Sequence, residues 1–233
     1  METAKNRKAF ENNIKTLTMI IDISMPVKEK MVVWPKSLKP HFRRVFSHER
    51  GDLWAQTELG FDLHTGTHID APLHRIRSGA SLDKMPLETL VGPAFVVFLP
   101  KVKAITADVL NELNLPKDTN RLLFKTSNSN FWSKKTIGFQ KKFVALTVDG
   151  AQWLAGHKIK LVGNDYLSVG QFTKDGKIQA EVHRILLGKG IVLLEGLNLS
   201  GVKPGDYQLM CLPLKLVGTE AAPCRAVLID NNR

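Results

Sequence analysis

The stretch Phe61-Asp62-Leu63-His64-Thr65-Gly66-Thr67-His68-Ile69-Asp70-Ala71-Pro72-Leu73-His74 is the densest group of potential metal ligands in the chain. Three of the seven histidines and one aspartate fall within the eleven positions from His64 to His74. Neutral imidazoles and a carboxylate are the usual ligands of a catalytic Zn²⁺ or Mn²⁺, and three such ligands leave a coordination position for water. The stretch therefore predicts a metal site that can support catalysis.

The spacing within this stretch predicts its local structure. Because His64 and His68 are four residues apart, one helical turn or a tight loop could direct both at one ion. Asp70 would then point away from that helical face, and Pro72 argues against a long helix. We expect a strand, a turn at residues 65–67, and then a short irregular or helical segment.

The last histidine of the stretch, His74, is a candidate proton carrier. It follows Pro72, and we expect it to face the same cavity without binding metal. A neutral histidine beside an activated water is a natural general base or acid. The alternative is that these histidines are ordinary surface residues, which is the usual situation for a single histidine. The crowding of three histidines and one aspartate into a segment punctuated by glycine and proline favours a site.

A second informative stretch runs from Glu181 to Glu195. Its apolar spacing predicts a short helix carrying His183, followed by a buried strand over residues 191–194. Glu195 comes at the end of that strand. A carboxylate is costly to bury unless it is paired or bound to metal, so Glu195 is a candidate ligand. A glutamate at a solvent-exposed strand end is the alternative.

The pattern His64-x-Gly66-Thr67-His68-x-Asp70-x-Pro72-x-His74 resembles the signature of the metal-dependent cyclase-like hydrolases. That family includes bacterial kynurenine formamidase (arylformamidase), isatin hydrolase and a trans-dienelactone hydrolase. The resemblance extends over most of the chain, from Ile21 to Leu228. It implies metal-activated hydrolysis of a carbon–nitrogen amide bond or a lactone.

The resemblance also implies a role for each site residue. It assigns proton transfer to His74. It assigns one or two ions of Zn²⁺ or Mn²⁺ to His64, His68, Asp70, His183 and Glu195. Asp70 would bridge two ions, because His183 and Glu195 have the family's spacing of twelve residues. An aromatic residue near residue 34 lines the substrate pocket in the family, so Trp34 is a candidate substrate contact. Core packing is an equal explanation for Trp34.

The alternation of strand-like and helix-like segments predicts an α/β fold. We expect an N-terminal arm over residues 1–16 and one domain over residues 17–233. The resemblance implies a layered β/β/α arrangement around a barrel-like mixed sheet, similar to swivelling domains. Predicted strands include residues 17–24 (buried), 94–99, 121–126 and 143–147, and the polar segment 127–132 is expected to form a loop.

Composition narrows the function classes. The net charge of +11 raises the question of nucleic acid, but the lysines are dispersed and no basic, aromatic-interleaved motif occurs. We expect a small-molecule substrate and no nucleic-acid partner. No apolar run approaches the roughly 20 residues that span a bilayer. Two cysteines without a pairing framework are consistent with the cytoplasm. The resemblance implies a homodimer or higher homo-oligomer.

Three hypotheses follow for function. The first is a broad metal-dependent hydrolase of amides or lactones. The second is a specific N-formylkynurenine formamidase of tryptophan degradation. The third is a metal-binding protein without catalysis. An intact His74 argues against the third, because metal binding alone does not require a proton carrier.

Overall fold

A single sheet that closes on itself forms the centre of the protein. The structure, a computed structural model, describes residues 19–133 and 138–230, so the predicted arm at residues 1–16 lies outside it. The sheet has the order β1-β10-β4-β8-β7-β6-β5-β9, and β9 also pairs with β10 and closes the ring. Strands β5, β6, β7 and β8 are mutually parallel, whereas β4, β9 and β10 pair antiparallel with their neighbours. The predicted barrel-like mixed sheet is confirmed.

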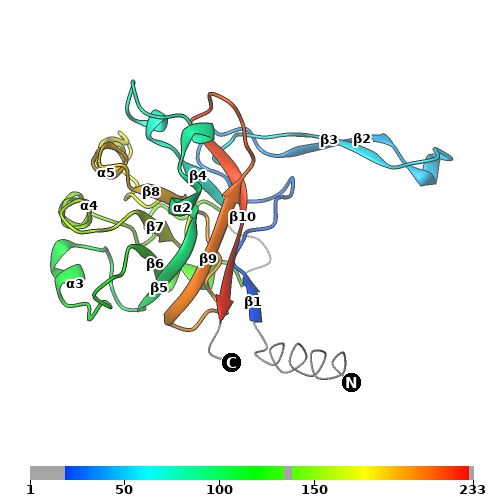
Figure 1. Ribbon diagram of the computed structural model, residues 1–233. Helices are drawn as coiled ribbons and strands as arrows, with labels where there is room; N and C mark the ends of the chain where they lie inside the picture. Colours follow the sequence, from blue (N-terminus) through cyan, green and yellow to red (C-terminus); the bar gives the residue numbers. More distant parts are fainter. Residues whose placement is uncertain (1–18, 134–137, 231–233) are drawn as a thin grey trace, which may run out of the picture.

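The strands and helices follow one another along the chain as drawn in Figure 1. The strands are β1 (Met19–Asp22), β2 (His41–Phe46), β3 (Gln56–Gly60), β4 (His68–Asp70), β5 (Val91–Leu99), β6 (Arg121–Thr126), β7 (Leu161–Asn164), β8 (Val192–Glu195), β9 (Gly205–Pro213) and β10 (Ala221–Asp230). The α-helices are α2 (Leu87–Leu90), α3 (Ala107–Asn111), α4 (Val148–Ala155) and α5 (Lys177–Gly188). Short 3-10 helices are η1 (His48–Arg50), η2 (Pro72–His74), η3 (Leu82–Lys84) and η4 (Ser127–Phe131).

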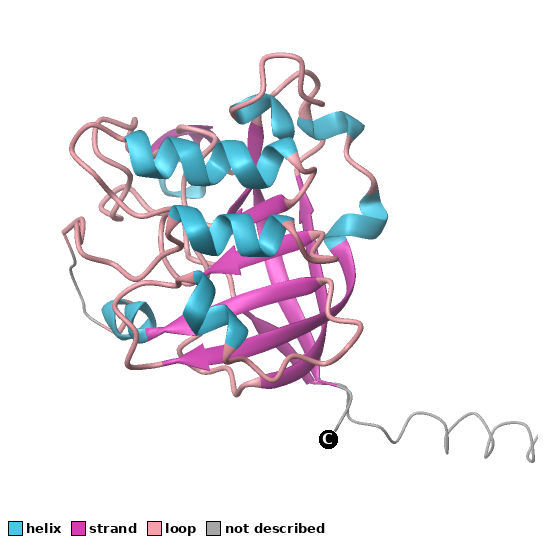
Figure 2. Ribbon diagram, turned by 90° about the vertical axis from the view of Figure 1, so that its left-hand side faces the viewer, coloured by secondary structure: helices cyan, strands magenta, loops and turns pink. Residues whose placement is uncertain are grey.

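The parallel strands separate two apolar cores. Because side chains alternate across a strand, Leu123 of β6 and Leu194 of β8 belong to the core inside the barrel. Their neighbours Leu122 and Leu193 face the other way and pack in the core under the helices. Helices α3, α4 and α5 lie over this outer face, as Figure 2 shows. The result is the predicted layered α/β domain. Every helix in the described part of the chain is too short or too polar to cross a membrane.

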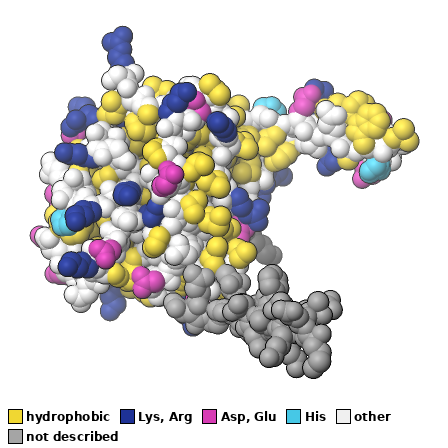
Figure 3. All heavy atoms as spheres, viewed as in Figure 1, with side chains coloured by type: hydrophobic (Ala, Val, Ile, Leu, Met, Phe, Trp, Pro, Cys, Tyr) yellow, Lys and Arg dark blue, Asp and Glu magenta, His cyan; other side chains and the backbone are white. Residues whose placement is uncertain are grey.

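Strands β2 and β3 form a separate hairpin that projects from the barrel (Figure 1). Four large apolar side chains of this hairpin are exposed: Phe42, Leu53, Trp54 and Leu59. Figure 3 shows hydrophobic side chains gathered at its tip.

Three local predictions differ from the structure. The strand predicted as buried over residues 17–24 is the edge strand β1, where Ile20 is 66% exposed. Residues 143–147 form no strand but two isolated bridges at Leu146, to Ile105 and to Gly170. The segment predicted as a polar loop after β6 is the helix η4, in which Asn128 and Ser129 are buried. The buried Asp165 carboxylate accepts hydrogen bonds from this helix, which explains why its polar residues are internal.

Candidate metal centre

Strand β4 sets the geometry of the site. His68 and Asp70 are two residues apart on β4, so their side chains point to the same face. Glu195 of β8 is the direct cross-strand partner of His68. The helical turn considered for His64 and His68 does not form. Pairing of residues 68–70 with β8 and β10 makes a strand there instead.

Two glycines bring the loop before β4 against the end of β8. Gly66 and Gly196 have φ angles of +68° and +69°, which only glycine adopts readily. A Cβ on Gly196 would lie 2.0 Å from the carbonyl oxygen of Gly66. The hydroxyl of Thr67 donates a hydrogen bond of 2.6 Å to the Gly196 carbonyl. This packing carries His64 toward the residues of β4 and β8.

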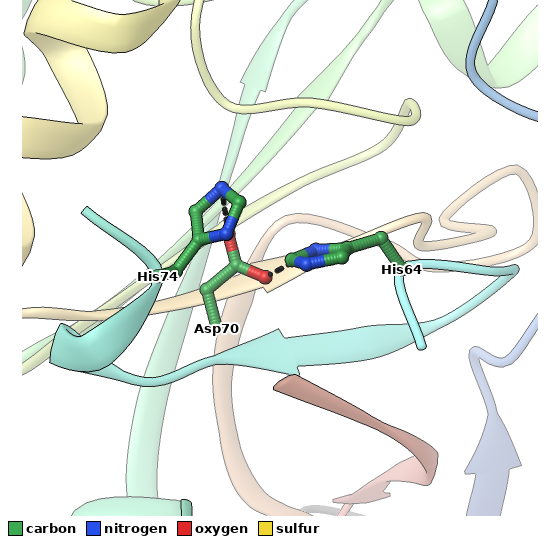
Figure 4. Close-up of side chains that lie close together, drawn as sticks. All are labelled: His64, Asp70 and His74. Carbon is green, nitrogen blue, oxygen red and sulfur yellow. Dashed lines mark ion pairs between the residues drawn. The ribbon is translucent and has the colours of Figure 1, made fainter. Parts of the chain in front are cut away.

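Asp70 lies at the centre of the site and is fully buried. Its Oδ1 lies 2.9 Å from Nδ1 of His64 and 3.5 Å from Nε2 of His68. Its Oδ2 lies 3.7 Å from Nε2 of His183 and 3.9 Å from Nε2 of His74. Figure 4 shows His64 and His74 on either side of the carboxylate. Four imidazoles therefore surround one buried carboxylate.

Glu195 is a second buried carboxylate beside Asp70. Its Oε1 lies 3.0 Å from Nε2 of His183 and accepts a hydrogen bond of 2.7 Å from the backbone of Val169. Its Oε2 lies 3.4 Å from Nε2 of His68. The strand-end glutamate is therefore internal, and the solvent-exposed alternative is wrong.

Several polar atoms at this centre lack hydrogen-bond partners among the described residues. They are both carboxylate oxygens of Asp70 and Nε2 of His68, all buried. Buried polar atoms are normally satisfied, so such a cluster needs a specific explanation. His64, Asp70 and His74 form one group whose ligand atoms lie within 4.8 Å of one another, and His68, Asp70 and Glu195 form another. Nitrogen and carboxylate donors around a common space fit a divalent transition ion.

The pKa values of the two histidines that flank Asp70 are shifted in opposite directions. Burial lowers the pKa of His64, but contact with the Asp70 carboxylate outweighs burial and raises it to about 9. Burial dominates at His74 and lowers its pKa to about 4, although Asp70 acts in the opposite direction. His74 is therefore neutral near pH 7. Burial opposes ionisation of Glu195, but His183 holds the pKa of that carboxyl well below its usual range.

In His68, His183 and His64, the ring nitrogen that faces away from Asp70 lies close to a protein oxygen. The sequence did not predict these contacts. Nδ1 of His68 lies 3.0 Å from the carbonyl oxygen of Gly66. Nδ1 of His183 lies 2.7 Å from the carbonyl oxygen of Gln179, one turn earlier in α5. Glu220 lies beside His64, 3.5 Å from its Nε2. A glutamate 156 positions after its histidine has no local sequence signal, whereas the carbonyl of residue i−4 follows from helix geometry.

Trp34, the predicted substrate contact, lies in an aromatic cluster. Its ring centroid is 5.0 Å from that of Phe139 and 5.6 Å from that of Phe172. A surface cavity of about 400 Å³ adjoins Trp34 and Phe139. The same cluster contains Tyr166, whose carbonyl oxygen accepts a hydrogen bond from the backbone of Gly196, next to Glu195. The aromatic residues thus adjoin the end of β8, and contact with substrate remains a prediction.

The mixed barrel with its buried His/Asp/Glu cluster has the ligand set of a metal-binding protein, and the comparisons identify the family. The family model described as "Putative cyclase" matches residues 21–171. The chain belongs to this family. It is 44% identical over 181 residues to Cyclase-like protein 2 of Oryza sativa subsp. japonica, covering 74% of this chain and 64% of that protein. It is also 36% identical over 219 residues to the kynurenine formamidase of Salinibacter ruber, covering 91% of this chain and 97% of that protein.

Solved structures agree with this assignment. A structure described as a potential metal-dependent hydrolase with cyclase activity is 34% identical and has a TM-score of 0.77, covering 91% of this chain and 98% of that one. Isatin hydrolase A from Labrenzia aggregata has a TM-score of 0.78 at 20% identity, covering 96% of this chain and 100% of that one, and shows the same fold. The predicted family and fold class are confirmed.

Proposed function

We propose that this protein is a metal-dependent hydrolase of carbon–nitrogen amide bonds, or of the related lactones. One observation carries the proposal. The Asp70 carboxylate is fully buried, neither of its oxygens has a hydrogen-bond partner among the described residues, and four imidazoles and a second carboxylate lie around it within ion-pair distances or as potential ligands. This arrangement is costly for folding alone, and a bound cation would offset the cost. The family and its hydrolase relatives support the same reaction class.

The residues divide into a holding set and a proton carrier. The holding set comprises His64, His68, Asp70, His183 and Glu195. Bound there, a divalent ion would supply Lewis acidity and a lowered pKa for water. Asp70 belongs to both groups of potential ligand atoms, so it is the residue able to serve two ions.

His74 is the proposed general base and acid. Its neutral imidazole adjoins the Asp70 carboxylate, with 3.9 Å between Nε2 and Oδ2. It would accept a proton from the attacking water and return it to the leaving nitrogen or oxygen. Asp70 would stabilise the resulting imidazolium, since an adjacent carboxylate favours the charged form. His74 is also close enough to His64 and Asp70 to serve as a ligand, and the metal content of His74→Ala distinguishes the two roles.

N-formylkynurenine is the proposed first substrate. The kynurenine formamidase of Salinibacter ruber aligns with nearly its whole length, which supports an amide. The aromatic cluster around Trp34 supports an aryl substrate, because aromatic rings pack favourably against one another. Cyclic amides and lactones are the next substrates to test.

Hydrolysis of N-formylkynurenine by protein reconstituted with Zn²⁺ or Mn²⁺ tests the proposal, with His74→Ala as a matched variant. We expect His74→Ala to retain the metal content of the unsubstituted protein and to lose at least about 10²-fold in turnover. Loss of metal from His74→Ala would reassign His74 as a ligand. Bound metal without hydrolysis of amides, cyclic amides or lactones would contradict the hydrolase function.

We propose the identity of the metal, the oligomeric state, the cellular location and the class of partner on separate grounds. Nitrogen and oxygen donors favour Zn²⁺ or Mn²⁺, and metal analysis after expression in each metal distinguishes them. The exposed apolar hairpin of β2 and β3 supports a homodimer, which light scattering would test. Free Cys211 and Cys224 support a cytoplasmic location. Lys and Arg are scattered over the face shown in Figure 3, which supports a small-molecule partner over nucleic acid.

A further inference from the structure

The two fully buried histidines of the site share one arrangement. In His68 and His183, Nδ1 lies against a backbone carbonyl oxygen, at 3.0 and 2.7 Å. A carbonyl only accepts hydrogen bonds, so Nδ1 carries a proton in both rings, and Nε2 is the nitrogen left to supply a lone pair once an ion is bound. Nε2 of each ring faces Asp70 and Glu195. The outer oxygen therefore selects the tautomer and aims the lone pair at the site.

His64 has the same arrangement with its nitrogens exchanged. Its Nδ1 faces the site, 2.9 Å from Oδ1 of Asp70, and its Nε2 faces Oε1 of Glu220 at 3.5 Å. We propose that Glu220 is the positioning residue of His64: it holds the Nε2–H tautomer and directs the Nδ1 lone pair at the ion. This inference rests on the proposed metal-dependent function.

The backbone fixes Glu220 beside the metal segment. The amide of Ala71, directly after Asp70, donates a hydrogen bond of 2.9 Å to the Glu220 carbonyl oxygen. Ala221, the next residue, is the register partner of Asp70 at the start of β10. The side chain of Glu220 is 41% exposed, so holding a negative charge there costs little desolvation.

The contact differs from those of the other two histidines in both charge and length. When a carboxylate accepts the hydrogen bond from a ligating imidazole, it raises the basicity of the ring toward the metal more than a neutral carbonyl does. At 3.5 Å the contact is at the outer limit for a hydrogen bond. We expect it to shorten when Nδ1 binds an ion, because the proton then resides on Nε2.

Zinc affinity of Glu220→Ala, Glu220→Gln and Glu220→Asp tests the proposal, measured by competition with a chelator. We expect Glu220→Ala to bind Zn²⁺ about 10–100-fold more weakly. Glu220→Gln should lose less, since its amide oxygen still accepts a hydrogen bond, and Glu220→Asp should recover part of the loss. Glu112→Ala, which removes an exposed carboxylate at the end of α3, is the matched control and should bind normally.

Histidine side-chain NMR supplies a readout that a purely structural role would not change. In the zinc-loaded protein we expect a protonated Nε2 for His64 and a protonated Nδ1 for His68 and His183. The Nε2–H signal of His64 should be lost or shifted in Glu220→Ala, while metal-free variant and parent unfold at the same temperature. If the parent binds zinc, and Glu220→Ala has the same zinc affinity and the same His64 signals as the parent, this inference alone is overturned. Absence of zinc binding by the parent would overturn the proposed function as well.

Discussion

Replacing Asp70 by asparagine should abolish stabilisation of the protein by metal. Asp70 belongs to both groups of potential ligand atoms, and its side chain is fully buried. Asparagine keeps the size of the side chain but removes the charge and one acceptor oxygen. Loss of this one carboxylate therefore removes a ligand from either ion. In contrast, His64→Ala removes a potential ligand from only one of the two groups.

The expected effect follows from binding linkage. An ion at 100 times its dissociation constant stabilises the native state by about 2.7 kcal/mol. In a chain of 233 residues, each kcal/mol shifts the melting temperature by roughly 2–4 °C. Each bound ion should therefore raise the melting temperature by about 5–11 °C relative to chelator-treated protein.

Thermal unfolding with and without Zn²⁺ measures this shift. We expect the full shift in the parent, a smaller shift in His64→Ala and none in Asp70→Asn. Asp206→Asn, at an exposed position on β9, is the matched control and should behave as the parent. A full zinc shift in Asp70→Asn would refute the central role of this carboxylate.

Three further predictions concern packing and ionisation. The Gly196→Ala variant should unfold at a lower urea concentration than the Gly190→Ala variant. Both glycines have a φ near +70°, but only a Cβ at position 196 meets backbone, 2.0 Å from the carbonyl oxygen of Gly66. Equal urea midpoints for the two variants would contradict this prediction. In metal-free protein the pKa of His64 is raised to about 9 from 6.5. The stability that protonated His64 adds to the folded protein is therefore fully present below pH 6.5 and is lost as the pH rises through 9. Urea titrations should show this loss in the parent and a smaller one in His64→Gln. Burial raises the pKa of Cys224 to about 12, so mass spectrometry should find it unmodified by iodoacetamide at pH 8 in native protein and modified in urea.

The sequence was sufficient to select the residues of the cluster. His64, His68, Asp70 and His74 are close in the chain, so their meeting needs only a short turn. His183 and Glu195 are harder to place, and their selection depended on the family's spacing. The structure brings the other five together around the buried Asp70 carboxylate. Residue types and short spacings carry this information because metal ligands are few in kind.

The local conformation was less predictable, because distant strands determine it. Residues 68–70 form a strand only because β8 and β10 pair with them, and a spacing of four residues cannot show that. The apolar segment 143–147 looks like a strand but bridges its neighbours only at Leu146. Pairing partners override local propensity in sheets. The contact of Glu220 with His64 was missed for the same reason, since β10 returns to β4 from the end of the chain.

Anomalous diffraction at the zinc absorption edge, from crystals grown with Zn²⁺, tests the central claim most directly. The account predicts an anomalous peak beside the Asp70 carboxylate, with ligand atoms about 2.0–2.2 Å from the ion. These ligands should come from His64, His68, Asp70, His183 and Glu195, and Asp70 should contact every ion present. A cluster without a peak, or zinc bound only elsewhere on the protein, would contradict the account.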